Sequence, residues 1–506
     1  MTTSTEPTHA KQPVSTERAD DTFVGRRREL EAISRSLAAV ASRGGRLEIV
    51  SGAPGIGKTR LTHEVAAIAR GRGFYVLRGG CWEGEGAPAY WPWADVLRNH
   101  LGAPRDDAAG TAIDFSQLLE VAATRAGVPV RGIVDPSKDA QQARFMLFDR
   151  FCEFLAATAG GQPVLVIIDD VQSADIGSLL LLQFLAGRLA KLPIALLVTS
   201  RDPLSEMTAS TSRHAWARHI VLHGLSRSEA RALLAARAAR TPGRAVLDRL
   251  MHLTDGNPYF LKELGQLLVD GEAGFDPTGA VALPASLLVV TLQPYHRLSV
   301  GCRSLLQAAS VVGREFDAEL AARAAGLPIR EALGLLDEAV ERRVVTAAGA
   351  ARYHFAHALV REAIHDQLHP SDRTRLHESI AVALERQAEE GERVSAATLA
   401  HHFCKALPLT QRRQAALYCI AAGESAHTAF AYEEAVFQLR RAQEISGTSL
   451  TELESCDLLL RLGAAEAGAG EWARSRRTFE DAAAVARRIN CPERLAHAAL
   501  GFKGMM

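Results

Sequence analysis

Short apolar runs alternate with helical patterns from residue 23 to about 223. Runs of this kind, bounded by polar or glycine-rich segments, are typical of strands that are buried on both faces of a parallel sheet. We expect the helical stretches to cover both faces, because parallel strands need crossover connections. The predicted strands are Leu47–Val50, Phe74–Leu77, Val164–Asp169, Ile194–Thr199 and His219–Leu222. The pattern therefore predicts an α/β domain.

Beyond residue 223 the pattern is mainly helical. The segment "SRSE" at 226–229 matches a capping box and predicts a helix start, followed by an alanine- and arginine-rich helical region that runs to about 270. Residues 271–284 are rich in Gly and Pro and are predicted to form a linker. Residues 285–368 predict three helices, a short hairpin that pairs Val344–Thr346 with Tyr353–Phe355, and one more helix. That order suits a winged helix.

The last part of the chain contains an internal repeat. Small residues recur where helices would cross, with an aromatic residue near the turn, at a constant offset of 40 residues. This spacing fits tetratricopeptide-like helical pairs with a six-residue insertion. The matching positions are Gly423, Tyr432, Ala435, Leu439 and Ala442 in the first copy, and Gly463, Trp472, Ser475, Phe479 and Ala482 in the second. Two pairs and one further helix are fewer than the three or so repeats that close a solenoid core, so we expect the array to be incomplete.

Composition narrows the range of functions. The 506 residues carry a formal net charge of zero, which argues against a general polyanion-binding surface. The seven cysteines include no CxxC pair, so neither a zinc ribbon nor a disulfide framework is indicated. The segment His401-His402-x-Cys404 has no evident partner cluster, and we interpret it as ordinary surface and packing.

The ends and the hydropathy of the chain predict a location. Residues 1–22 lack an apolar segment and are predicted to be a disordered leader. No apolar run approaches the roughly 20 residues of a membrane helix, and we expect a soluble, cytoplasmic protein with no membrane partner. The expected domains are the leader 1–22, an α/β core 23–223, a helical lid and linker 224–284, a winged helix 285–370, and repeats 371–506.

A phosphate-binding loop follows the first predicted strand. Glycines let the backbone wrap closely around phosphate, lysine reaches the outer phosphates, and a threonine hydroxyl serves Mg²⁺ at the start of a helix. The spacing Gly52-x-x-x-x-Gly57-Lys58-Thr59 matches this pattern in a chain with only 7 Lys against 51 Arg. We predict binding of ATP or ADP with Mg²⁺ by Gly52, Ala53, Pro54, Gly55, Ile56, Gly57, Lys58, Thr59 and Arg60.

Two other predicted strands end in residues suited to the same site. Asp169 and Asp170 end the apolar strand 164–169, where Asp169 would hold Mg²⁺ together with Thr59. Asp170 would orient or polarise an attacking water. In the strand 194–199 and the residues after it, Thr199 or Ser200 could sense a γ-phosphate, and Arg201 could reach it with a planar donor fork.

These motifs resemble a known family. The segments "FVGRRREL" (23–30), "GAPGIGKT" (52–59), "VIIDD" (166–170), "VTSR" (198–201) and "GNPYFLKEL" (256–264) are similar to those of the STAND class, the AAA-related signal-transducing P-loop ATPases with numerous domains. Within that class, the chain most resembles the ATPase core of large LuxR-family, maltose-regulator-type activators and related adenylyl cyclase regulatory regions. The resemblance covers about residues 23–490.

The resemblance implies further contacts. Val24, Gly25 and Arg26 would lie near the adenine and ribose, and Pro258 would pack on the adenine. His357 in "RYHFAHALVREAI" (352–364) matches a histidine that contacts the diphosphate in the closed state, although Leu359 stands where the motif has an acid.

The order of nucleotide core, hinge domain and repeats favours a switch over a motor. We expect ATP to stabilise an open form, with Arg201 as reader, and ADP a closed form through His357, with slow hydrolysis as the reset. An unknown protein or small-molecule effector would bind the repeats, self-association is a further expectation, and DNA contact would need an output domain not seen in this chain.

Two alternatives stay open. One is an origin-recognition-like DNA-binding ATPase, although residues 301–350 hold six Arg against seven Asp plus Glu and so lack a basic face. The other is a repeat scaffold in which ATP is merely structural.

Overall fold

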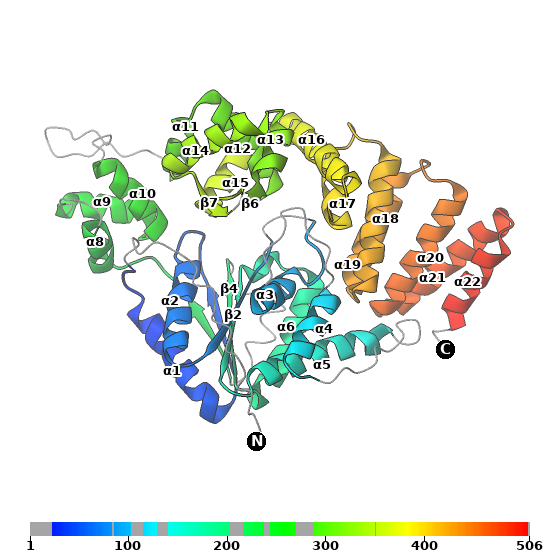
Figure 1. Cartoon of the computed structure of the whole chain (residues 1–506), viewed down its shortest axis with the longest axis horizontal. Helices are drawn as coiled ribbons and strands as arrows, with labels where there is room; N and C mark the ends of the chain where they lie inside the picture. Colours follow the sequence, from blue (N-terminus) through cyan, green and yellow to red (C-terminus); the bar gives the residue numbers. More distant parts are fainter. Residues whose placement is uncertain are drawn as a thin grey trace, which may run out of the picture.

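The computed structural model describes residues 23–82, 86–102, 115–128, 140–201, 216–236, 243–269, 287–349 and 351–503. The predicted leader (1–22) and linker (271–284) lie outside these ranges. Figure 1 shows an α/β core at the bottom left, with the rest of the chain arching over it and returning to its other side.

The α/β core is built on a five-stranded parallel sheet with the strand order β2-β3-β4-β1-β5. All five predicted strands are confirmed, with ends within about three residues. Because β4 lies between β1 and β3, the residues that follow these three strands meet at one edge of the sheet. The strands are β1 (Arg46–Ser51), β2 (Tyr75–Gly80), β3 (Val164–Asp169), β4 (Ile194–Ser200) and β5 (Ala217–Val221).

Helices cover both faces of this sheet, as the continuous apolar strands require. In β3, Leu165 and Ile167 face α1 and α2, whereas Val164, Val166 and Ile168 face the cluster that contains α3 to α6. These helices are α1 (Arg27–Arg43), α2 (Lys58–Gly71), α3 (Trp91–Leu101), α4 (Phe115–Arg125), α5 (Ala140–Thr158) and α6 (Ile176–Arg188), and short 3₁₀ turns η1 (Val171–Ser173) and η2 (Leu189–Lys191) flank α6.

A three-helix unit follows the sheet: α8 (Arg227–Ala235), α9 (Arg244–Thr254) and α10 (Pro258–Val269). The predicted capping box is confirmed, because Ser226 and Glu229 each accept a hydrogen bond from the other's backbone N–H. Leucines from all three helices form a small core of their own.

Next comes a module of five helices and a three-stranded antiparallel sheet, which we call the β6–β8 module. The predicted hairpin forms between β7 (Val345–Gly349) and β8 (Arg352–Phe355). The prediction of three preceding helices was wrong, since there are four, and the short strand β6 (Glu315–Asp317) was missed. Its helices are α11 (Leu287–His296), α12 (Val300–Val312), α13 (Ala318–Ala325), α14 (Ile329–Glu341) and α15 (Ala358–Gln367).

Seven helices complete the described chain: α16 (Pro370–Glu389), α17 (Ala396–Lys405), α18 (Arg412–Thr428), α19 (Tyr432–Ser446), α20 (Glu452–Gly468), α21 (Trp472–Arg488) and α22 (Pro492–Lys503). The repeat of 40 residues has a packing basis. A Cβ on Gly423 would lie 2.6 Å from Leu439, and one on Gly463 would lie 3.0 Å from Phe479, the residue that matches Leu439 in the repeat. Each glycine thus lets two helices of a pair approach closely.

The C-terminal helices pack against the α/β core, on the side of α3 to α6 (Figure 1). One hydrophobic cluster runs from strand residues such as Leu47 to Ala465 of α20. Polar contacts accompany it: the Tyr90 hydroxyl donates to the Phe430 carbonyl at 3.3 Å, and the Tyr432 hydroxyl to the Ala140 carbonyl at 3.1 Å. The core and the C-terminal helices therefore share one interior.

Candidate functional site

The predicted phosphate loop joins β1 to α2. Its backbone requires glycine, because Gly52, Gly55 and Gly57 have φ values of 155°, 78° and 99°. Space is also limited, since a Cβ on Gly55 would lie 2.8 Å from the Cβ of Tyr259. Helix α2 begins at Lys58, so the amides of its first turn have no intrahelical carbonyl and form an anion-binding helix start.

Lys58 is buried within this loop. Its ammonium donates to the Gly52 carbonyl at 2.7 Å and lies 3.4 Å from the Ala53 carbonyl. The backbone carbonyls of the loop thus hold the Lys58 ammonium against the glycine turn. The neighbouring Thr59 is exposed, and Arg60 forms an ion pair of 2.8 Å with Glu64 along α2.

Asp169 ends β3 in a polar cluster at the same edge of the sheet. Its Oδ1 accepts from the Thr199 hydroxyl at 3.1 Å and its Oδ2 from the Arg78 guanidinium at 3.2 Å. Burial raises the pKa of Asp169 above its ordinary value, although the Arg78 charge opposes the rise. Arg78 also donates to the Thr62 hydroxyl at 2.9 Å and so links β2, α2 and β3.

A chain of hydrogen bonds connects Asp170 to Arg201. The Asp170 backbone amide donates to the Thr199 hydroxyl at 2.9 Å. Asp170 itself has a left-handed φ of 58°. The Gln172 side-chain amide donates to Asp170 Oδ1 at 3.0 Å, and its oxygen accepts from the Arg201 backbone N–H at 3.0 Å. The ends of β3 and β4 are therefore tied together through Gln172.

The Arg201 side chain reaches out of the core to the β6–β8 module. Its Nη1 lies 2.5 Å from Oε1 of Glu362 on α15, and both side chains are about three-quarters buried. This ion pair joins residues 161 positions apart. The guanidinium predicted to read a phosphate is thus bound to a carboxylate of the next module.

The segment Val24-Gly25-Arg26 lies between the loop and the three-helix unit. Arg26 donates to the Ile56 carbonyl at 3.0 Å, and burial lowers its pKa despite the nearby Glu29 and Glu229. A Cβ on Gly25 would lie 2.5 Å from a Glu229 carboxylate oxygen, and Val24 packs against the core of the three-helix unit. The segment predicted to line a nucleotide therefore contacts the phosphate loop.

The motif at 256–259 also contacts this loop. The buried Asn257 side chain donates to the Pro54 carbonyl at 2.9 Å and accepts from the Tyr259 amide at 3.1 Å. Pro258, half-buried, is the first residue of α10, where its fixed φ suits a helix start. Asn257 thus holds the three-helix unit on the loop.

His357 closes the site from the β6–β8 module. Its ring stacks on Tyr259 with a centroid distance of 3.9 Å, and its Nδ1 caps α15 by accepting from the Leu359 amide at 3.2 Å. Burial lowers the pKa of His357 to about 4, and the nearby Arg314, Lys262, Lys58 and Arg201 charges lower it further. The fold therefore brings His357 close to the phosphate-loop lysine.

The arrangement fits a nucleotide phosphate with Mg²⁺. Glycine turns, a buried lysine and a helix start follow β1, and a partly neutralised carboxylate ends β3, on the other side of β4. The ends of parallel strands are where such folds bind ligands. Lys58 and the loop amides would hold phosphate oxygens, and Thr59 and Asp169 offer the oxygen ligands that Mg²⁺ prefers. The bound ion would supply charge neutralisation at the outer phosphates.

Sequence reasoning missed five residues that complete the site: Arg78, Gln172, Asn257, Tyr259 and Glu362. Asn257 and Tyr259 stand within a quoted motif, so position alone could have suggested them. Arg78 directly follows the predicted strand 74–77, which pairs with the strand that ends in Asp169, and a charged residue at that point is a usable signal. Glu362 shows no local signal, since its partner is far away in the sequence.

The comparisons with known proteins agree with this geometry in part. Residues 22–198 match a family model described as AAA ATPase domain. The chain contains an AAA-type ATPase domain. An uncharacterized protein of Rhizobium meliloti (strain 1021) is 24% identical over 508 aligned residues, which are 92% of this chain and 47% of that protein. The chain thus spans about half the length of this curated relative.

Several solved structures align with the chain at low similarity. A STAND protein with a tetratricopeptide repeat sensor from Pyrococcus horikoshii has 14% identity and a TM-score of 0.43, covering 97% of this chain and 82% of that one. Cdc6p from Pyrobaculum aerophilum has 13% identity and a TM-score of 0.34, covering 69% and 97%. Drosophila ORC bound to DNA has 12% identity and a TM-score of 0.33, covering 72% and 95%.

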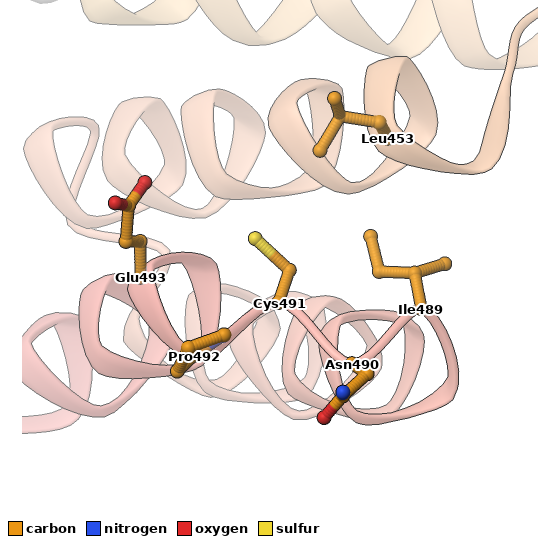
Figure 2. Close-up of a pocket in the computed structure, with 6 residues that line it drawn as sticks. All are labelled: Leu453, Ile489, Asn490, Cys491, Pro492 and Glu493. Atoms are coloured by element: carbon orange, nitrogen blue, oxygen red, sulfur yellow. The ribbon is translucent and has the colours of Figure 1, made fainter.

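The hydropathy of the helices and a surface pocket at the C-terminal helices do not belong to the candidate nucleotide site. Among the helices of the described ranges, none has the length and apolar character needed to cross a membrane. A surface pocket of about 500 Å³ lies where the turn between α21 and α22 faces α20 (Figure 2). It is lined by Leu453, Ile489, Asn490, Cys491, Pro492 and Glu493, which bring no cation or glycine turn together.

Proposed function

We propose that the protein is a nucleotide-controlled switch of the STAND type, in which ATP and ADP favour different arrangements of the β6–β8 module on the α/β core. The observation that carries this proposal is the 2.5 Å ion pair between Arg201 and Glu362. It uses the arginine that the sequence predicts to reach a γ-phosphate, and it joins two separate modules. We call the arrangement that contains it the docked form.

Competition for one guanidinium supplies the difference between the nucleotides. A γ-phosphate that draws the Arg201 side chain toward the phosphate loop would move its guanidinium away from Glu362, whose carboxylate it now contacts through Nη1. A ligand shifts a two-state equilibrium only by binding one form more tightly than the other. ATP would therefore release Glu362 and weaken docking, whereas ADP would leave the ion pair in place.

His357 provides a second contact between the β6–β8 module and the side of the core that holds the phosphate loop. Its stack on Tyr259, which follows Pro258 at the phosphate loop, ties the start of α15 to the nucleotide side of the core. Because Glu362 lies on the same helix, α15 touches both the loop side and Arg201. Helix α15 would thus report the state of the nucleotide to the rest of the β6–β8 module, which we interpret as a winged helix.

Slow hydrolysis would reset the switch. Asp170 accepts from Gln172, and Gln172 in turn accepts from the Arg201 backbone N–H, so the residue proposed to orient water is linked to the backbone of the residue that forms the ion pair. Turnover in the docked form would therefore be low. An effector, either a protein or a small molecule, would bind the tetratricopeptide-like helices that pack on the core, and the whole would serve as the regulatory part of a transcriptional regulator in the cytoplasm.

The test compares nucleotide preference in matched variants. Glu362→Gln keeps the shape of the side chain but removes its charge. We expect this variant to raise the affinity for a slowly hydrolysed ATP analogue relative to ADP by about 5- to 150-fold, the range of typical couplings. Titration calorimetry measures both affinities, and hydrogen exchange at α15 reports undocking.

Glu319→Gln is the control, because Glu319 is about half exposed and forms a 2.6 Å ion pair with Arg323 inside the same module. It should leave the ratio of the two affinities unchanged. An unchanged ratio in Glu362→Gln as well, with equal exchange at α15, would overturn the proposal.

A further inference from the structure

Three histidines meet at the junction between the β6–β8 module and the C-terminal helices. His377 comes from α16, and His401 and His402 come from α17. A ring nitrogen of each lies within 4.8 Å of a ring nitrogen of the others, and all three side chains are buried. The interpretation of His401 and His402 as ordinary packing without a partner cluster was therefore incomplete, because the fold brings His377 to them from 24 residues away.

We infer that His377, His401 and His402 form a binding site for a divalent transition-metal ion of the zinc type. Imidazole nitrogens are the ligands that Zn²⁺ and its neighbours prefer, and three protein ligands are the number that open zinc sites use, with water completing the tetrahedron. The site does not depend on the nucleotide chemistry proposed above.

The geometry is close to that of a coordination shell. The Nδ1 atoms of His377 and His402 are 2.9 Å apart, and the ring centroids of the three pairs lie between 5.0 and 5.4 Å. Ligand atoms around a tetrahedral zinc are about 3.3 Å apart for bonds of about 2.0 Å. An ion bound by the three nitrogens would replace the hydrogen bond that now joins His377 and His402.

Charge and burial agree with a cation as the occupant. Burial and the two neighbouring rings lower the pKa of His402 well below its ordinary value. A neutral imidazole carries one ring proton. When that proton is on Nε2, the Nδ1 lone pair is available for a metal ion and no proton is released on ligation. The three buried imidazoles thus present ring nitrogens to one another, and these are the atoms with which histidine ligates a metal ion.

The site would also fasten a loop of the core. A Cβ on Gly86 would lie 2.9 Å from the Cβ of His401, and the Thr398 hydroxyl donates to the Gly86 carbonyl at 3.1 Å. Ion binding that fixes the orientation of α17 would thus stabilise its contact with the core. This gives a readout of stability in addition to binding.

The experiment is a metal titration of the untagged full chain after treatment with a chelator. We expect one Zn²⁺ per chain, a rise in the thermal unfolding temperature, and a visible Co²⁺ spectrum of a tetrahedral site without thiolate charge-transfer bands. His377→Ala and His402→Ala should each weaken binding at least about 100-fold, since even outer-shell changes cost 10- to 100-fold.

Two controls separate this site from other ligands. His252→Ala removes an exposed histidine of α9, and Cys404→Ser removes a thiol on α17 that lies 3.4 Å from Cys419. Both should bind Zn²⁺ as the natural chain does. If the natural chain and the His377→Ala, His402→Ala double variant retain equal amounts of ion, or if Cys404→Ser abolishes binding, the site is not the one inferred. Circular dichroism identifies any variant that fails to fold, and a His402→Cys variant, which keeps a ligand, should then restore binding.

Discussion

The Nη1 atom of Arg144 on α5 lies 2.8 and 2.9 Å from the two carboxylate oxygens of Glu433 on α19, which is 289 residues away. The same guanidinium lies over the ring of Tyr432, 5.6 Å from its centroid. Both charged side chains are mostly buried, at 17% and 22% exposure. This contact fixes the C-terminal helices on the core at a point far from the phosphate loop.

Arg144→Gln should weaken this docking, because it leaves a largely buried Glu433 carboxylate without its cation. A double-mutant cycle with Glu433→Gln should give a coupling free energy of about 0.5–3 kcal/mol, measured by chemical denaturation. Arg476→Gln, which removes an exposed pair within α21, should cost less than about 1 kcal/mol. Equal costs for both arginines would contradict the role of the interface.

Lys58→Ala should abolish ATP binding, because it removes the buried cation from the glycine loop. Titration calorimetry checks this result. The exposed Lys191 provides the control, and Lys191→Ala should bind like the natural chain. Equal ATP affinity in Lys58→Ala would remove the basis of the phosphate-loop assignment.

Asp169→Asn should spare much of the nucleotide binding but remove Mg²⁺-dependent hydrolysis, because the amide offers the metal no negative charge. Phosphate release at a range of Mg²⁺ concentrations measures the effect. Asp481→Asn, an exposed change on α21, should keep the natural rate. Hydrolysis at the natural rate in Asp169→Asn would mean that another residue holds the ion.

The lowered pKa of His357 predicts that the stability of the folded chain falls as the pH falls. Its pKa is about 4 in the folded chain and about 6.5 in the unfolded chain, so the unfolded chain binds more protons between these values. The contribution of neutral His357 to stability is full above pH 6.5 and is lost as the pH falls toward 4, by at most about 3 kcal/mol.

Denaturation of the natural chain and of His357→Phe across pH 4–7 checks this prediction. The phenylalanine keeps a ring against Tyr259 but does not titrate, so the variant should lose less stability on acidification. Parallel curves for the two proteins would contradict it.

Gly423→Ala should destabilise the chain by about 1–3 kcal/mol, because the added Cβ would lie 2.6 Å from the buried side chain of Leu439. Gly334→Ala is a matched change inside α14, where no atom lies within 4 Å of the added Cβ. It should be neutral or stabilising by up to about 1 kcal/mol, since alanine favours helix. Thermal unfolding of both variants decides the point.

The sequence predicted the α/β core well because its signals are local. Each buried parallel strand is a continuous apolar run, and the glycine spacing of the loop reflects backbone angles that only glycine adopts readily. The repeat was visible for a similar reason, since Gly423 and Gly463 each meet the residue at the matching position of their own copy.

The parts that were missed depend on distant partners. The strand β6 has three residues, too few for a period-two pattern, and it forms only because β8 pairs with it. Arg201 could be proposed from its place after β4, but Glu362 could not be paired with it before the β6–β8 module was placed on the core. The three histidines were hidden in the same way, because only the packing of α16 on α17 unites them.

The hydrophobic cluster that joins Leu47 to Ala465 has a consequence for how a cell makes this protein. The ribosome releases the strands of the core first, and the helices that cover one side of the α3–α6 layer leave it last. At about 5–20 residues per second, this apolar surface stays uncovered on the order of tens of seconds. A nascent chain therefore exposes this surface until its C-terminal helices have been synthesised, and a fragment cut after β5 would expose it permanently.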